Sequence, residues 1–140
     1  MATIDEVLHR FKELNHVVLA TVDGDKPKLR PMTLVKHKDT FYFATGSNAT
    51  KVNQLSQNPE VEFILQWKEE PNNGYIRVEG TALREKSIET ITSLYNKHYY
   101  FGKLWEGPDD PTLIVYRVEP RVYDYMKPGD WASIIVKAGD

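Results

Sequence analysis

The feature that most constrains the fold is a closely spaced series of short β-type segments in the first half of the chain. Val17–Val22 is apolar and rich in β-branched residues, and Asp23-Gly24 follows it as a dipeptide typical of tight hairpins. Residues 26–37 and 40–45 read as two further strands, the second with aromatic residues that favour β structure. This order favours an antiparallel sheet over alternating βαβ units.

The rest of the chain adds helices and further strands. Thr3–Leu14 is predicted as a helix, because Thr3 and Glu6 have the spacing of a capping box and apolar residues recur at helical spacing. Residues 69–74 and 99–110 are predicted loops. The other predicted elements are a short helix from about 48 to 58, strands at 61–67 and 75–83, a helix at 87–99, and a strand at 112–118 that continues at 121–126 after Pro120. The fold class is therefore mainly β (α+β), with helices at the periphery of an antiparallel barrel.

Composition restricts the partners and the compartment. With 140 residues we expect a single domain over residues 1–140, and the net charge of −2 argues against a nucleic-acid partner. Cysteine is absent, which excludes disulfides, thiolate metal sites and a thiol nucleophile. No apolar run approaches the roughly 20 residues of a membrane span, and no signal peptide is recognisable, so we expect a cytoplasmic protein.

One polar cluster precedes the short helix. Its members are Thr45, Ser47, Asn48, Thr50 and Lys51. A helix N-terminus exposes unsatisfied amides and carries partial positive charge, and both features suit a phosphate monoester. The alternative interpretation is a helix cap, because Ser, Asn and Thr are the usual capping residues.

The second candidate is the tetrapeptide Arg30-Pro31-Met32-Thr33 in the returning strand. Arg30 could reach a phosphate or a ring edge with five donors in a fixed fork. Pro31 lacks an amide donor, so the sheet must be open or bulged there. The alternative is a surface arginine beside a tolerated proline on an edge strand.

This succession of elements resembles the flavin-binding split barrels related to pyridoxamine 5′-phosphate oxidase, over roughly residues 4–126. The resemblance implies an antiparallel split β-barrel that binds flavin mononucleotide (FMN) beside its second strand and the start of its first internal helix. The residues that it places at the cofactor are Arg30, Pro31, Met32, Thr33, Thr45, Ser47, Lys51 and Gln54.

The resemblance also implies a homodimer with the flavin at the interface, where aromatic residues of the partner subunit often cover the ring. Candidates are Tyr99, Tyr100, Phe101, Trp105 and Trp131, and Trp105 is preferred because its Gly/Pro-rich setting suggests a loop. The alternative is that these aromatics pack the core or the dimer interface.

The expected activity is flavin-dependent oxidation or reduction of a small molecule. No side chain stands out as an acid or base, so no catalytic residue is named, and the scattered histidines suggest no metal site. Oxidation of vitamin B6 itself is not expected, because residues 134–140 lack the arginine-containing motif of the true oxidases. Alternatives are the deazaflavin F420 as cofactor, a non-catalytic flavin or haem sensor or storage protein, and a barrel that has lost its cofactor.

Overall fold

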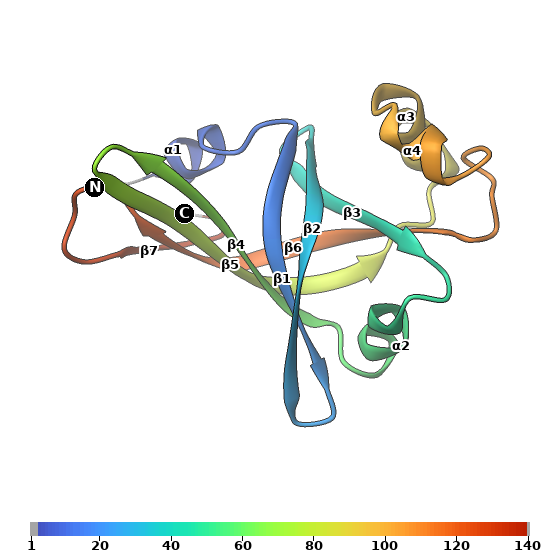
Figure 1. The fold of residues 1–140 in the computed structure, drawn as a ribbon, viewed down its shortest axis with the longest axis horizontal. Coiled ribbons are helices and arrows are strands. Elements are labelled where there is room, and N and C mark those ends of the chain that lie inside the picture. Colours follow the sequence, from blue (N-terminus) through green and yellow to red (C-terminus); the bar gives the residue numbers. More distant parts are fainter. Residues whose placement is uncertain (1–2, 140) are drawn as a thin grey trace.

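The protein, described here from residue 3 to residue 139 of a computed structural model, folds into a seven-stranded antiparallel sheet that closes on itself (Figure 1). The strand order is β3-β2-β1-β4-β5-β6-β7, and an additional pairing of β3 with β6 closes the ring. The expected mainly β split barrel is therefore confirmed. The strands are β1 (Leu14–Asp23), β2 (Lys26–His37), β3 (Thr40–Gly46), β4 (Glu60–Glu69), β5 (Asn72–Arg84), β6 (Leu113–Met126) and β7 (Ile134–Lys137).

Within residues 3–139, four helices lie around the barrel, with α3 and α4 next to each other on one side and α1 on the other (Figure 1). They are α1 (Ile4–His9), α2 (Thr50–Gln57), α3 (Ile88–Lys97) and α4 (Tyr100–Leu104).

Three predicted boundaries are corrected. The first helix ends at His9, not Leu14, because the chain then turns Phe11 into the barrel core and begins β1 at Leu14. The predicted loop at 99–110 contains α4, whose Phe101 is buried. The loop at 69–74 shrinks to a tight turn, because β4 and β5 pair as far as Glu69 and Asn72.

The β1–β2 hairpin determines where the barrel opens. Its loop is Gly24-Asp25, and Gly24 takes a φ of +64°, which suits the first position of a two-residue hairpin turn. Strand β2 pairs with β1 from Lys26 to Val35, but with β3 only from Val35 to His37. Its edge from residue 26 to residue 34 is consequently free, and Pro31 lies on that edge, as its missing amide predicts.

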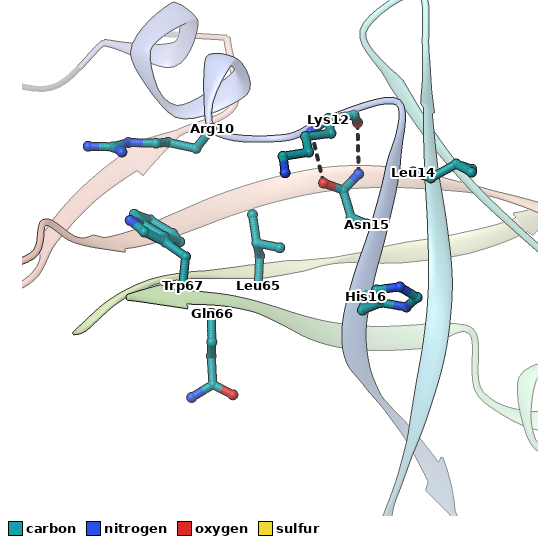
Figure 2. Close-up of a pocket in the computed structure, with 8 residues that line it drawn as sticks. All are labelled: Arg10, Lys12, Leu14, Asn15, His16, Leu65, Gln66 and Trp67. Atoms are coloured by element: carbon teal, nitrogen blue, oxygen red, sulfur yellow. Dashed lines mark hydrogen bonds between the residues drawn. The ribbon is translucent and has the colours of Figure 1, made fainter. Parts of the chain in front are cut away.

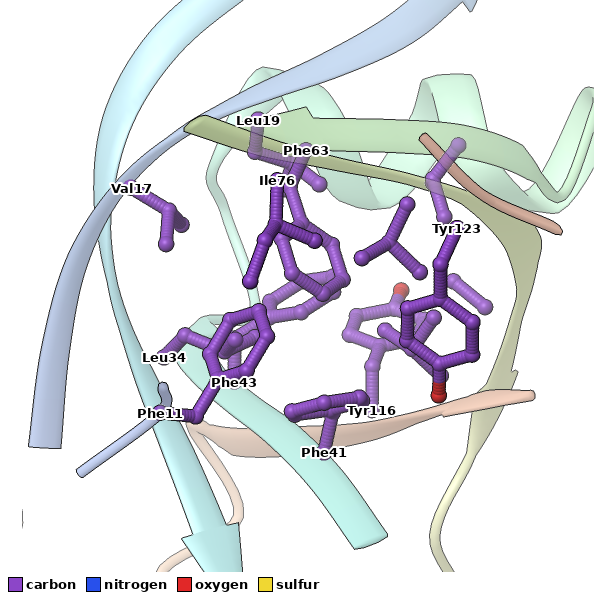
Figure 3. Packing of buried hydrophobic residues seen from close by; sticks show 14 of the residues in the cluster. Phe11, Val17, Leu19, Leu34, Phe41, Phe43, Phe63, Ile76, Tyr116 and Tyr123 are labelled. Atoms are coloured by element: carbon purple, nitrogen blue, oxygen red, sulfur yellow. The ribbon is translucent and has the colours of Figure 1, made fainter. Parts of the chain in front are cut away.

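Two apolar clusters stabilise the fold. The larger fills the barrel with aromatic rings from several elements (Figure 3). Phe11 and Phe63 both contact Phe41, at centroid distances of 4.8 and 5.4 Å, and Phe43 stacks on Tyr116 at 5.1 Å. Such ring pairs add about 0.5–1.5 kcal/mol each beyond the area that they bury.

The smaller cluster attaches α3 and α4 to the outside of the barrel. Its members are Val35, Tyr42, Leu94, Phe101, Trp105, Leu113 and Val115. Strand β3 is therefore covered on both faces, and α4 is held next to its carboxyl end.

A β-bulge interrupts the pairing of β5 with β6. Glu79 pairs with Val122 and Gly80 with Pro120, so Arg121 is the extra residue. This bulge replaces the break predicted at Pro120, and it confirms the bulge or close approach predicted at Gly80. A Cβ built on Gly80 would lie 2.4 Å from the carbonyl oxygen of Glu119.

We therefore expect Gly80→Ala to lower the free energy of unfolding by about 1–3 kcal/mol, because the added methyl group overlaps a paired backbone. Chemical denaturation measures the loss. Gly102→Ala is the control, since its Cβ would meet nothing closer than 3.6 Å within α4, and we expect it to be neutral or stabilising by up to about 1 kcal/mol. Equal stabilities of the two variants would contradict the close approach.

Candidate functional site

A cleft of about 620 Å³ opens where β2 separates from β3. Strand β2 contributes Met32, the carboxyl end of β3 and the following turn contribute most of one wall, and α4 closes the other side. The lining residues are Met32, Ala44, Thr45, Gly46, Ser47, Asn48, Lys51, Leu104, Trp105 and Thr112.

The start of α2 faces this cleft without a side-chain cap. Its N-cap residue is Ala49, and no side chain accepts a cap hydrogen bond there. The alternative that Ser47 or Asn48 serves as the helix cap is therefore wrong.

The backbone amides at this turn are only partly available. Those of Ser47 and Ala49 already donate to the carbonyl oxygens of Thr112 and Gly46, at 2.9 and 3.1 Å. Those of Asn48, Thr50 and Lys51 have no hydrogen-bond partner within residues 3–139. Fewer amides are free than the sequence suggested, because the turn is tied to β6.

Lys51 connects the helix to the end of β3. Its ammonium group donates to the hydroxyl of Thr45 at 2.8 Å, and the Thr45 side chain is buried. Burial lowers the pKa of Lys51 below its ordinary value of 10.5, and the nearby charge of Arg30 lowers it further.

Arg30 is held by β1 and α2. Its Nη1 donates to the carbonyl oxygen of Leu19 at 3.2 Å, and its Nη2 donates to Oε1 of Gln54 at 3.1 Å. The same Gln54 oxygen accepts from the hydroxyl of Thr21 at 2.5 Å. Burial also lowers the pKa of the Arg30 guanidinium, which stays charged at any physiological pH.

Arg30 and Lys51 therefore form a pair of half-buried cations that lack counterions. Each of them contacts only neutral acceptors, and within the described chain neither lies within 4.0 Å of a carboxylate oxygen. Two like charges in a partly desolvated setting destabilise one another. An anion that bound between them would relieve both costs.

A second cleft, of about 360 Å³, has Arg10 and Trp67 in its lining (Figure 2). It lies where β1 and β4 part beyond the Val17–Leu65 pair. Its Arg10 lies 5.0 Å from the ring centre of Trp67, donates to the hydroxyl of Tyr125 at 3.0 Å and pairs with Glu69 at 3.6 Å. That arginine is already neutralised, so this cleft is the weaker candidate for an anion.

Of the residues predicted at the cofactor, Met32, Thr45, Ser47, Lys51 and Trp105 line the β2–β3 cleft. Arg30 and Gln54 lie beside it and are hydrogen-bonded to one another, whereas Pro31 and Thr33 are on the free edge of β2 but do not line the cleft. Their roles at a cofactor stay predictions. Sequence reasoning missed Thr21, because a buried threonine in a β-strand is ordinary and its contact with α2 is long-range.

The aromatic candidates differ in burial and in whether they line the cleft. Trp105 is the extended C-cap residue of α4, at the start of the predicted loop that leads to β6, is only 8% exposed, and lines the cleft. Tyr100 and Phe101 pack in the smaller cluster, and burial raises the pKa of Tyr100 to about 12. Tyr99 is exposed, and Trp131 is fully exposed.

Residues 3–139 contain no group of three or more metal-ligating side chains placed to hold a metal ion. Within the same part of the chain, no helix has the length and apolarity to cross a membrane.

Fold and cleft together define a small antiparallel split barrel with two cations at its split that have no carboxylate partner in the described part of the chain. A family model described as pyridoxamine 5′-phosphate oxidase matches residues 3–127. General stress protein 26 of Bacillus subtilis (strain 168) is 29% identical over 113 residues, which are 80% of this chain and 79% of that protein. The chain belongs to the pyridoxamine 5′-phosphate oxidase family.

One further relative is similar in sequence, and two solved structures are similar in fold. Pyridoxine/pyridoxamine 5′-phosphate oxidase of Ehrlichia ruminantium (strain Welgevonden) is 34% identical over 98 residues, which are 68% of this chain but only 46% of that oxidase. The crystal structure of general stress protein 26 from Bacillus anthracis str. Sterne matches with a TM-score of 0.70 and 25% identity over 89% of each chain. A heme binding protein from Mycobacterium smegmatis shares the fold at a TM-score of 0.74, with 13% identity over 89% of this chain and 53% of that one.

The charge of Lys51 predicts a pH dependence. Only the ammonium form attracts an anion, so any affinity for inorganic phosphate that Lys51 contributes is lost as pH rises through the pKa of Lys51, which lies below 10.5. Bound phosphate favours the charged form and therefore raises that pKa.

We expect a titration of the Lys51 Cε resonance by NMR to show a midpoint that increases on addition of phosphate. Arg30→Met should also raise the midpoint of the unliganded protein, because it removes a repulsive charge. A midpoint that phosphate leaves unchanged would contradict an anion site at Lys51.

Proposed function

We propose that this protein binds FMN in the β2–β3 cleft and uses it in the oxidation or reduction of a small molecule. The observation that carries the proposal is the pair Arg30 and Lys51, half-buried and without carboxylate partners within the described residues. A phosphate monoester supplies about two negative charges at neutral pH. It would match this pair in charge.

The residues at the split suit such a ligand in three ways. Lys51 and Arg30 supply charged donors, and the Ser47 hydroxyl and the unpaired amides of Asn48 and Thr50 lie at the same helix start. Met32 and Trp105 supply apolar walls for a ring.

The free edge of β2 is the third feature. Residues between Lys26 and Leu34 pair only with β1, so the backbone groups on their other side are available to a heterocycle. Thr33 can offer such groups, whereas Pro31 offers only its carbonyl and an apolar surface.

When bound, flavin would supply hydride transfer, and this chain would supply position and electrostatics. We name no acid or base, because no carboxylate or histidine lines the cleft. Reduction of the bound cofactor by a nicotinamide, followed by reoxidation by a second substrate, would indicate an enzyme. The absence of such turnover would indicate a sensor or storage role.

The first test is an absorbance spectrum of the purified protein before and after incubation with FMN and desalting. We expect retained flavin bands near roughly 370 and 450 nm, a property of the cofactor itself. A Soret band would identify haem instead, and retention of F420 in place of FMN would identify the deazaflavin. A protein that retains none of the three would contradict the proposal.

The phosphate placement has its own test. Lys51→Ala combined with Ser47→Ala should weaken FMN binding by about 2–4 kcal/mol, because one charge-assisted and one neutral hydrogen bond are lost. Riboflavin, which lacks the phosphate, is the matched control ligand, and its affinity should change little. Equal losses of affinity for both ligands, or no loss of FMN affinity in a folded variant, would show that the phosphate does not bind at Lys51 and Ser47.

We also propose that two copies associate through the outer face of the sheet. This outer sheet face consists of Val18, Ala20, Leu29 and Ile64, which border a mostly apolar hollow of about 360 Å³. The charged residues in its lining are Glu62 and Arg77, which pair with one another at 3.6 Å. Leu29 is 70% exposed. Apolar side chains that gather on an exposed face are typical of an interaction surface, and family resemblance favours a second copy as the cover.

Leu29→Asp should therefore convert a dimer to a monomer at micromolar concentrations, because it places a charge within the apolar contact. Size-exclusion chromatography with light scattering measures the mass. Ile88→Asp, at a residue of α3 that is 56% exposed, is the control and should leave the mass unchanged. Dimers that persist with Leu29→Asp would exclude this face, and a monomeric wild-type protein would exclude the assembly.

A further inference from the structure

A buried threonine lies behind the cation pair. Thr21 is 1% exposed on β1, and its hydroxyl contacts Oε1 of Gln54 on α2 at 2.5 Å. Thr21 lies on the inner, buried side of β1, between half-buried neighbours. A valine would fill the same volume, so the hydroxyl must be explained by the hydrogen bond that it makes.

The direction of each hydrogen bond in this network is fixed by chemistry. A guanidinium only donates, so the atom of Gln54 that faces Arg30 must be the carbonyl oxygen. The hydroxyl of Thr21 faces that same oxygen and must donate as well. Gln54 therefore accepts from both sides, and its orientation depends on the two donors together.

The network also connects β1, β2 and α2 through the side-chain oxygen of Gln54. Arg30 is anchored by the Leu19 carbonyl on β1 and by Gln54 on α2. Removal of the Thr21 donor would leave the Gln54 carboxamide held only by Arg30, free to rotate with it. A long side chain with few fixed contacts loses several rotamers on binding, whereas one that is already fixed loses less.

We propose that Thr21 is a positioning residue, which acts through Gln54 to pre-orient the Arg30 guanidinium for an anion. The inference rests on the proposed phosphate site, and it assigns the Thr21–Gln54 pair a role beyond attaching α2 to the barrel. It predicts that the Thr21 hydroxyl matters for phosphate only while Arg30 is present.

The test is a double-mutant cycle with FMN and riboflavin as ligands. Thr21→Val should lower FMN affinity by about fivefold to tenfold, the effect of one hydrogen bond, with riboflavin affinity unchanged. Thr21→Ser retains the hydroxyl and should restore FMN affinity to within about twofold of wild type. In an Arg30→Ala background, Thr21→Val should have no further effect on FMN, because the group that it positions is gone.

A ligand-free measurement separates failure of the inference from failure of the proposed function. In the unliganded protein, the heteronuclear NOE of the Arg30 Nε–Hε group should report a rigid side chain, and Thr21→Val should make it mobile. A purely structural role for Thr21 would lower stability and leave that signal unchanged. If Thr21→Val does not fold, Gln54→Leu is the replacement variant for this measurement. Its position on α2 is half-buried, and it removes the acceptor through which Thr21 would act on Arg30.

The outcomes are distinct. If Arg30→Ala weakens FMN binding and Thr21→Val does not, the positioning role is wrong and the phosphate site stands. If FMN binds no more tightly than riboflavin, the phosphate site is wrong, and the NMR signal alone decides whether Thr21 orders Arg30. An additive double mutant, or an unchanged NOE, overturns the inference.

Discussion

The divergence of β2 from β3 is the constraint on which the site depends. Strand β2 follows β1 from Lys26 to Val35 but pairs with β3 only from Val35 to His37, whereas β3 continues along β6 as far as Gly46 and so completes the barrel. The two strands diverge beyond the Val35–Tyr42 pair, toward Leu34 on β2 and Phe43 on β3, and the cleft is the space between them. The free edge, the tolerated proline and the exposed start of α2 are all consequences of this one division of partners.

Electrostatics then distinguishes this cleft from the other gap in the barrel. The described sheet opens between β2 and β3 and between β1 and β4, and an arginine lies in or beside each gap. Arg10 is neutralised by Glu69 and covered by Trp67, whereas Arg30 is held by neutral acceptors beside Lys51. A neutral scaffold fixes a cation without cancelling its charge, which is the arrangement that an anion site requires.

Local patterns predicted the elements better than their ends. The hairpin and the helix cap at Thr3 depend on neighbouring residues and both occur, although the two-residue loop is Gly24-Asp25 and not Asp23-Gly24. The glycine at position 80 also indicated a close approach, which the structure places at the Glu119 carbonyl of β6. The errors came from long-range contacts. The first helix stops early because Phe11 is needed in the core, and α4 forms because Phe101 packs against the outside of β3 and β6.

The sequence by itself determined the mainly β architecture and the types of group available to a phosphate, because alternation, turn residues and helix caps are short-range signals. It placed Arg30 and Lys51 on separate elements without showing that their charges interact. Only the tertiary structure decided that both are half-buried with no counterion among residues 3–139, that Ala49 gives the helix no side-chain cap, and that Thr21 reaches Gln54. Those facts depend on which strands pair and which do not, and strand pairing is settled by packing over the whole barrel.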